Sequence, residues 1–113
     1  MDKLTVIKVG GQVVENDDSL NKLLDRFNEI SSYKVLVHGG GRVATEVAAR
    51  LGIEAKMVEG RRITDEDMLE VITMVYGGLI NKKIVAGLQA RGCNALGLTG
   101  ADLNLISASK RPV

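Results

Sequence analysis

The stretch Val35–Leu36–Val37–His38–Gly39–Gly40–Gly41–Arg42 decides the fold of this chain. Three apolar, β-forming residues run directly into three consecutive glycines, and a helical pattern starts immediately afterwards. A short buried strand that ends in a glycine turn at a helix N-terminus presents backbone N–H groups to an anion. A smaller version of this junction, Lys8–Val9–Gly10–Gly11, occurs earlier in the chain. The two turns together predict an anion-binding site in an α/β protein.

The residues before this stretch predict a β-α-β unit. Leu4–Val9 is rich in branched residues and apolar on both faces, which is typical of a parallel strand covered by helices on each side. Asp17 or Asp18 is expected to cap the helix that follows. Its apolar side chains recur at helical spacing, at Leu20, Leu23, Leu24, Phe27 and Ile30. Val35–Val37 is then the second strand, reached by a right-handed crossover.

The residues after the glycine triplet predict a helix and a hairpin. Apolar and small residues from Val43 to Leu51 lie on one helical face, and Gly52 is expected to end that helix. Residues 53–63 predict a β-hairpin with Glu59–Gly60 as its turn.

The last third of the chain predicts one long helix and two short strands. Thr64–Asp67 has the hydroxyl cap and acidic residues of a helix start. The helix is expected to run to Gly92 and to be loosened by Gly77–Gly78. Residues 94–98 and 103–108 are predicted to be strands.

The composition excludes several classes of protein. A length of 113 residues, with 45% apolar and 26% charged residues, predicts one globular domain. A formal net charge of +1 and only three aromatic residues argue against a nucleic-acid surface. A single Cys93 and a single His38 allow neither an intrachain disulfide nor a zinc site of four N or S ligands. Without a signal-peptide pattern or an apolar run of about 20 residues, we expect a cytoplasmic protein that contacts no membrane.

The glycine turns and Lys8 predict the chemistry of the site. An anion's oxygen must approach the backbone to about 2.9 Å, which a glycine permits because it has no Cβ. Two such turns on adjacent parallel strands would flank one anionic group at the carboxyl ends of the strands. Lys8 interrupts a strand predicted to be buried on both faces, so its charge needs a compensating anion. Phosphoryl transfer requires positive charge at such a place, which favours a small-molecule kinase.

Three other polar residues have more than one interpretation. Arg62, in the pair Arg61–Arg62, could bind a substrate carboxylate in a bidentate manner, or the pair could simply be exposed. His38 could be a base, although a structural hydrogen bond is favoured. Asp102 is expected to support its own turn.

Competing motifs are weaker. Gly39-x-Gly41-x-x-Ala44 matches the loose dinucleotide pattern, with Glu59 as the ribose acid, but it follows the second strand and leaves Lys8 unexplained. The chain has no G-x-x-x-x-G-K-[ST] sequence, and its His-Gly-Gly-Gly has no accompanying G-x-S-x-G nucleophile elbow.

The ordered set of motifs resembles the amino acid kinase family. The matching segments are Ile7–Gly11, Val35–Gly41, Gly60–Thr64, Asn81–Lys82 and Gly97–Asp102. The resemblance runs along essentially all 113 residues and implies a three-layer α/β/α sandwich with a mainly parallel sheet. In that fold residues 1–113 would be the N-terminal, acylglutamate-binding half, and the C-terminal, ATP-binding half would be absent.

The resemblance also implies a reaction and a site. The γ-phosphate of ATP, with Mg²⁺ held mainly by the ATP phosphates, would pass to the side-chain carboxylate of N-acetyl-L-glutamate, in arginine biosynthesis. A related N-acylglutamate such as N-succinylglutamate is the alternative acceptor. Lys8 matches the lysine that stabilises the transferring phosphoryl group, and Gly10 and Gly11 match the turn beside the ATP phosphates. Gly40 and Gly41 match the glycines that contact the acceptor, and Arg62 matches the arginine that binds its α-carboxylate. No protein metal ligand is implied.

The same resemblance implies a quaternary arrangement. Residues 53–63 would be a lid over the acylglutamate, and the long helix from Thr64 would contribute to a homodimer. Members of the family are considerably longer than this chain, so we expect the 113 residues alone to be inactive. A non-catalytic substrate-binding or dimerisation module is the alternative.

Overall fold

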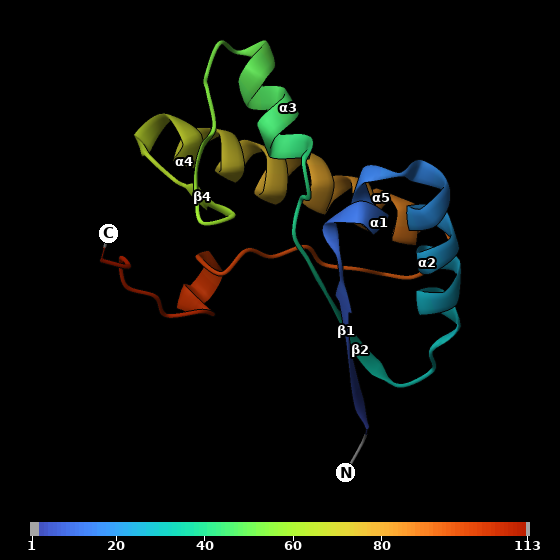
Figure 1. The fold of residues 1–113 in the computed structure, drawn as a ribbon. Helices are drawn as coiled ribbons and strands as arrows, with labels where there is room; N and C mark the ends of the chain where they lie inside the picture. Colours follow the sequence, from blue (N-terminus) through green and yellow to red (C-terminus); the bar gives the residue numbers. More distant parts are fainter. Residues whose placement is uncertain (1–2, 113) are drawn as a thin grey trace.

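A computed structural model describes residues 3–112. β1 (Leu4–Val9) and β2 (Tyr33–His38) pair in parallel, and the register places Val9 opposite His38. Helices α1 (Gly11–Glu15) and α2 (Asp17–Glu29) connect the two strands, as Figure 1 shows. The predicted β-α-β unit is confirmed, with β2 longer than expected at both ends.

The start of α2 differs from the prediction in two ways. The first glycine turn leads directly into α1, a short helix that the sequence analysis did not predict. Asn16, and not Asp17 or Asp18, caps α2: its side-chain oxygen accepts the Ser19 N–H at 3.0 Å. The extended backbone of Asn16 places its side chain under the first turn, whereas the two aspartates are already helical and lie beside the positive end of the helix dipole.

The second glycine turn leads into α3 (Val43–Arg50), and Gly52 ends that helix with φ +77° as predicted. β3 (Lys56–Val58) and β4 (Arg61–Ile63) then form an antiparallel hairpin. Its two turn residues, Glu59 and Gly60, both have positive φ, which matches the twist of a two-residue hairpin. The predicted hairpin is confirmed.

A continuous helix crosses the whole molecule (Figure 1). It consists of α4 (Glu66–Ile72), the π-helical segment η1 (Thr73–Ile80) and α5 (Asn81–Ala90). The wide turns of η1 contain Gly77–Gly78, so the predicted loosening is confirmed. The predicted hydroxyl cap is wrong, because the Asp65 carboxylate accepts the Met68 N–H at 2.9 Å.

By length and average composition alone, one helix of the described chain, Glu66–Ala90, could cross a membrane, although charged residues interrupt it and it holds no apolar run of about 20 residues. One stripe of this helix belongs to the buried core: Met68, Val71, Val75, Ile80, Ile84 and Leu88. An apolar stripe that packs inside a protein produces the same hydropathy, so the feature reflects a core helix.

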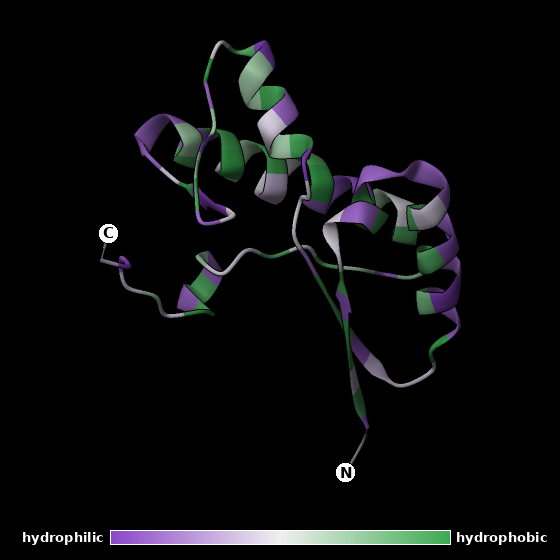
Figure 2. Cartoon of the chain, viewed as in Figure 1, coloured by the Kyte–Doolittle hydropathy of each residue, from purple (hydrophilic) through white to green (hydrophobic). Residues whose placement is uncertain are grey.

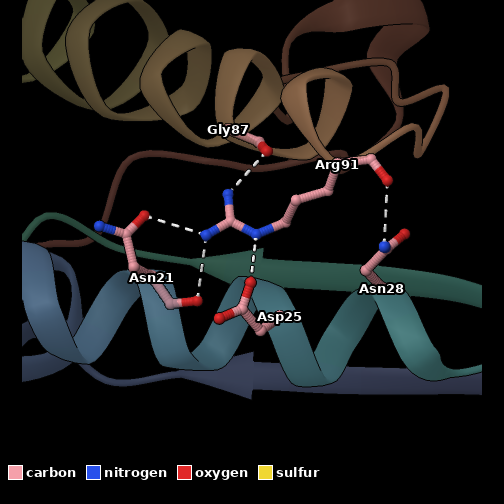
Figure 3. Close-up of polar contacts among 5 residues, drawn as sticks. All are labelled: Asn21, Asp25, Asn28, Gly87 and Arg91. Atoms are coloured by element: carbon pink, nitrogen blue, oxygen red, sulfur yellow. Dashed lines mark hydrogen bonds and ion pairs between the residues drawn. The ribbon is translucent and has the colours of Figure 1, made fainter.

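Arg91, just after α5, ties α5 to the crossover helix α2 (Figure 3). Its Nε donates to the Asp25 carboxylate at 2.7 Å, and its Nη1 donates to the Gly87 carbonyl at 2.8 Å. The Arg91 carbonyl accepts from the Asn28 amide at 3.1 Å. A Cβ on Gly87 would lie 2.7 Å from Leu24, so the two helices approach closely. This contact fixes the helical layer that supports the sheet.

Residues 94–98 and 103–108 are not strands, which corrects the prediction. Residues 94–98 are irregular, and Asp102–Asn104 forms the short 3₁₀ helix η2. Leu103 and Asn104 have φ of +56° and +51°, values that interrupt a strand. Within residues 3–112 the parallel sheet therefore has two strands.

Helices cover only one face of this sheet. Ile7 and Leu36 point inward and pack against the core, whereas alternate apolar side chains are 44–68% exposed: Leu4, Val6, Tyr33, Val35 and Val37. Figure 2 shows hydrophobic residues along both strands. The prediction of strands covered on both faces is wrong for the described residues, because none of their helices packs on the outer face. These residues form a parallel sheet with helices, and the three-layer sandwich stays a prediction.

Candidate functional site

The two glycine turns lie against each other at the carboxyl ends of β1 and β2, as predicted. A Cβ on Gly11 would lie 2.5 Å from the Gly41 Cα, and a Cβ on Gly41 would lie 2.8 Å from the Gly11 carbonyl oxygen. Gly41 also has φ +55°, so a side chain is disfavoured there for two reasons. In contrast, a Cβ on Gly10 or Gly39 would meet nothing within 4 Å. The turns are therefore packed where they touch and open beside that contact.

Glu15, at the end of α1, connects the two turns. Its Oε1 accepts the Arg42 backbone N–H at 2.7 Å and the Arg42 Nε–H at 3.2 Å. The backbone hydrogen bond is the main reason why the pKa of Glu15 lies below its usual range, and the side-chain bond raises the pKa of Arg42. The Glu15 carboxylate thus accepts the backbone N–H of Arg42, the residue before α3, and this bond holds the two turns in their relative position.

Lys8 lies on the open face of the sheet, two residues before Gly10. Its Cα pairs with that of Val37, and its side chain is exposed. None of the four ion pairs formed within residues 3–112 includes it. The prediction that Lys8 lies on a strand buried on both faces is wrong for the described residues, so the argument that its desolvation requires an anion no longer applies. What remains is its position, an exposed ammonium group on the strand that leads into the first glycine turn.

Arg62, on β4, reaches the second glycine turn through Tyr76 of η1. Its Nη1 donates to the Tyr76 hydroxyl at 3.2 Å, and its Nη2 donates to the Thr45 hydroxyl at 2.5 Å. Its Nε is buried and has no hydrogen-bond partner among the described residues. The Tyr76 ring packs on buried Gly40, where a Cβ would lie 2.0 Å from the ring. The neighbouring Arg61 is exposed.

His38, at the end of β2, has a structural role. Its Nε2 lies 3.1 Å from the Asn81 amide nitrogen, and its Nδ1 lies 2.9 Å from the Gly39 carbonyl. Asn81 is 7% exposed, donates to the Leu98 carbonyl and accepts from Lys82 Nζ at 2.9 Å. This pattern assigns the Asn81 nitrogen as the donor, so His38 accepts at Nε2 and donates from Nδ1. The imidazole joins β2 to α5, as the favoured interpretation predicted.

Two cavities, of about 740 and 590 Å³, both have Tyr76 and Gly77 in their lining. The larger cavity runs along β2 to His38, and the smaller one reaches Asp102. As predicted, Asp102 supports its turn: it accepts the Thr99 N–H at 2.7 Å and the Thr99 hydroxyl at 2.8 Å. The first of these bonds is the main cause of its lowered pKa. Among residues 3–112, no group of three or more His, Cys, Asp or Glu side chains could hold a metal ion.

The structure thus brings most of the predicted residues to one end of the sheet. The floor of the candidate site consists of the four glycines Gly10, Gly11, Gly40 and Gly41. Arg62 is connected to this floor through Tyr76, which packs on Gly40. Three residues that the sequence analysis missed complete the arrangement: Glu15, Thr45 and Tyr76. Only Tyr76 carried a usable signal. It lies four residues after Ile72 on the apolar stripe of the long helix, where a tyrosine hydroxyl needs a partner.

Comparisons with known proteins identify the family of this chain. The model of the "Amino acid kinase family" matches residues 3–112. The chain is 70% identical over 112 residues to acetylglutamate kinase of Bacteroides thetaiotaomicron and 69% identical to that of Bacteroides fragilis. It is 44% identical over 108 residues to the acetylglutamate kinase of Methanopyrus kandleri. These three alignments include 99, 99 and 96% of this chain, but only 44, 43 and 41% of the length of the respective relatives. The chain therefore spans less than half the length of these curated relatives.

Two solved structures share the fold. The protein smu.665 of Streptococcus mutans matches with a TM-score of 0.65 and 22% identity, over 81% of this chain and 38% of that one. N-acetylglutamate synthase of Neisseria gonorrhoeae, complexed with coenzyme A and L-arginine, matches with a TM-score of 0.56 and 21% identity, over 97% of this chain and 23% of that one. At these identities the likeness concerns the fold alone.

Proposed function

Because this chain belongs to the amino acid kinase family, we propose that it provides the acceptor-binding part of an acetylglutamate kinase. The reaction transfers the γ-phosphate of ATP to the side-chain carboxylate of N-acetyl-L-glutamate. One observation carries this proposal: the two glycine turns contact each other, and Arg62 lies near that contact because it hydrogen-bonds to Tyr76, which packs on Gly40. A single anion-binding turn serves many ligands, whereas two touching turns and an arginine suit an acceptor with two carboxylates beside a phosphate chain.

Each group has one task in this proposal. Gly40 and Gly41 border the acceptor carboxylate, Arg62 binds the α-carboxylate, and Gly10 and Gly11 border the ATP phosphates. Lys8 balances the negative charge that develops on the phosphoryl group in flight, which needs positive charge more than covalent help. The open backbone at Gly10 leaves room for phosphate oxygens.

The proposal extends to the surroundings of the site. Mg²⁺ would be held mainly by the ATP phosphates, and it would neutralise part of their charge. The hairpin of residues 53–63 would close over the acylglutamate, and the long helix would contribute to a homodimer in the cytoplasm. The relatives are more than twice as long as this chain, so we propose that residues 1–113 bind the acceptor and that turnover needs the remaining length.

The test uses a chimera in which this chain replaces the matching residues of the Bacteroides thetaiotaomicron relative. The expected result is ATP-dependent formation of an acyl phosphate from N-acetyl-L-glutamate, trapped with hydroxylamine as the hydroxamate. The 113-residue chain alone serves as the control and should form none. A folded chimera that phosphorylates neither N-acetyl- nor N-succinyl-L-glutamate would refute the proposal, and the ratio of the two rates identifies the acyl group.

A further inference from the structure

We propose that Tyr76 is a positioning residue for the acceptor, which holds the Arg62 guanidinium in the plane needed for the α-carboxylate. The inference rests on the proposed function and adds to it a residue on which the site depends. Tyr76 contacts both elements assigned to the acceptor: its ring packs on Gly40 and its hydroxyl accepts from Arg62. It therefore couples the floor of the site to the arginine.

The position of the Arg62 guanidinium depends on few hydrogen bonds besides the one to Tyr76. Apart from Tyr76, the Thr45 hydroxyl is the only group among residues 3–112 that accepts from the guanidinium, through Nη2. No acidic residue pairs with Arg62 in the described chain, where Arg42 and Arg91 do have carboxylate partners. The charge is thus held by two neutral hydroxyls, and the buried Nε has no partner. A guanidinium held this way is oriented without being neutralised, and it remains available to a carboxylate.

The environment of Tyr76 is built for one ring position. At Gly40 any side chain would overlap the ring, since even a Cβ would come within 2.0 Å of it. Tyr76 also lies in the π-helical segment η1, and such wide turns occur frequently at functional sites. Tyr76 is one of the residues that line both the cavity along β2 and the cavity near Asp102. A removal of the hydroxyl alone should therefore free Arg62 and leave the packing intact.

The variant Tyr76→Phe tests this, with Tyr33→Phe as the matched control, because Tyr33 is the only other tyrosine and lies exposed at the far end of β2. Calorimetry measures the binding of N-acetyl-L-glutamate to the 113-residue chain. We expect Tyr76→Phe to raise the dissociation constant roughly tenfold, as loss of a hydrogen bond to a charged group implies. Tyr33→Phe should leave it unchanged, and both variants should melt near the parent temperature.

A second readout needs no ligand. The Nε–Hε resonance of Arg62, assigned by its loss in Arg62→Lys, should shift or exchange faster with water in Tyr76→Phe and not in Tyr33→Phe. An unchanged Arg62 resonance, or equal affinities of the parent and Tyr76→Phe, would overturn the role of Tyr76 and leave the proposed function standing. Absence of any saturable binding to the parent chain would overturn both.

Discussion

Two lysines on neighbouring strands show how the same residue type takes opposite roles on the two faces of one sheet. Lys34, on β2, points toward the helices. Its Nζ donates to the carbonyls of Phe27, Asn28 and Ile30 at 2.8–3.2 Å, and it lies 5.1 Å from the centre of the Phe27 ring. Lys8, on β1, points outward and takes part in none of the ion pairs of the described residues.

The difference teaches that a lysine in an apolar strand is no functional signal by itself. Lys34 neutralises the negative end of the α2 dipole and satisfies its last carbonyls, so its charge serves the fold. Within residues 3–112 Lys8 has no such structural partner, and its side chain is exposed. Register alone decides between the two roles, because successive side chains on a strand point to opposite faces.

The largest expected effect is on turnover, and it separates the two lysines. Lys8→Met in the chimera should lower kcat for N-acetyl-L-glutamate about 100-fold or more, because a charge is lost where negative charge develops. KM for N-acetyl-L-glutamate should change little. Lys34→Met is the matched control and should retain kcat per folded molecule. Equal losses of kcat in both variants would remove the distinction.

The next effect is on the free energy of unfolding, and here Lys34→Met should have the larger effect of the two variants. Lys34→Met removes three hydrogen bonds from a half-buried charged group, and we expect the free energy of unfolding to fall by about 2 kcal/mol. Lys8→Met should change it by less than about 0.5 kcal/mol, as exposed substitutions do. Urea unfolding of the 113-residue chain measures both. A larger loss for Lys8→Met would mean that its outward side chain carries structure.

The glycine triplet shows a similar contrast between an open position, Gly39, and a packed one, Gly40. Gly40→Ala forces a Cβ into the Tyr76 ring and should cost about 1–3 kcal/mol of stability. Gly39→Ala, the matched control, places its Cβ in open space and should cost under about 1 kcal/mol. Thermal melts of the two variants compare them directly. Similar melting temperatures would show that the ring does not need Gly40.

The smallest effect concerns Glu15 and pH. Because the folded pKa of Glu15 is lowered, its hydrogen bonds stabilise the turns above about pH 4.3, the usual glutamate pKa, and this stabilisation is lost as the pH falls through the lowered value. Carbon NMR of the carboxyl groups should show Glu15 titrating below the usual glutamate pKa. The backbone N–H is the main cause, so Arg42→Ala should retain most of the lowering. A pKa of Glu15 at the usual glutamate value contradicts the assignment.

Much of the fold was predictable because local signals and packing agree. The stripe Leu20, Leu24 and Phe27 is buried in α2, Gly52 ends α3 and Glu59–Gly60 turns the hairpin. The prediction of strands at 94–98 and 103–108 was wrong because a strand needs a neighbouring strand to pair with, and a local sequence pattern does not show whether one is there. The prediction that helices cover the outer face of the sheet was wrong for the same reason, since it too depends on distant parts of the chain.

The candidate site was predictable in its backbone more than in its side chains. Glycine pairs after strands signal their own turns, and parallel pairing brings them together, so the Gly11–Gly41 contact follows from the sequence. The Glu15–Arg42 link spans 27 residues and the Arg62–Thr45 bond spans 17. Contacts of that kind depend on how helices are placed, and no spacing rule predicts them.

The most direct test of the central claim is a calorimetric titration of the 113-residue chain with N-acetyl-L-glutamate. Saturable binding at one site, weakened about tenfold or more by Arg62→Gln and unchanged by the exposed neighbour's variant Arg61→Gln, is the predicted result. Binding that survives Arg62→Gln, or that Arg61→Gln weakens equally, would contradict the assignment of the acceptor to the end of the sheet where the glycine turns meet.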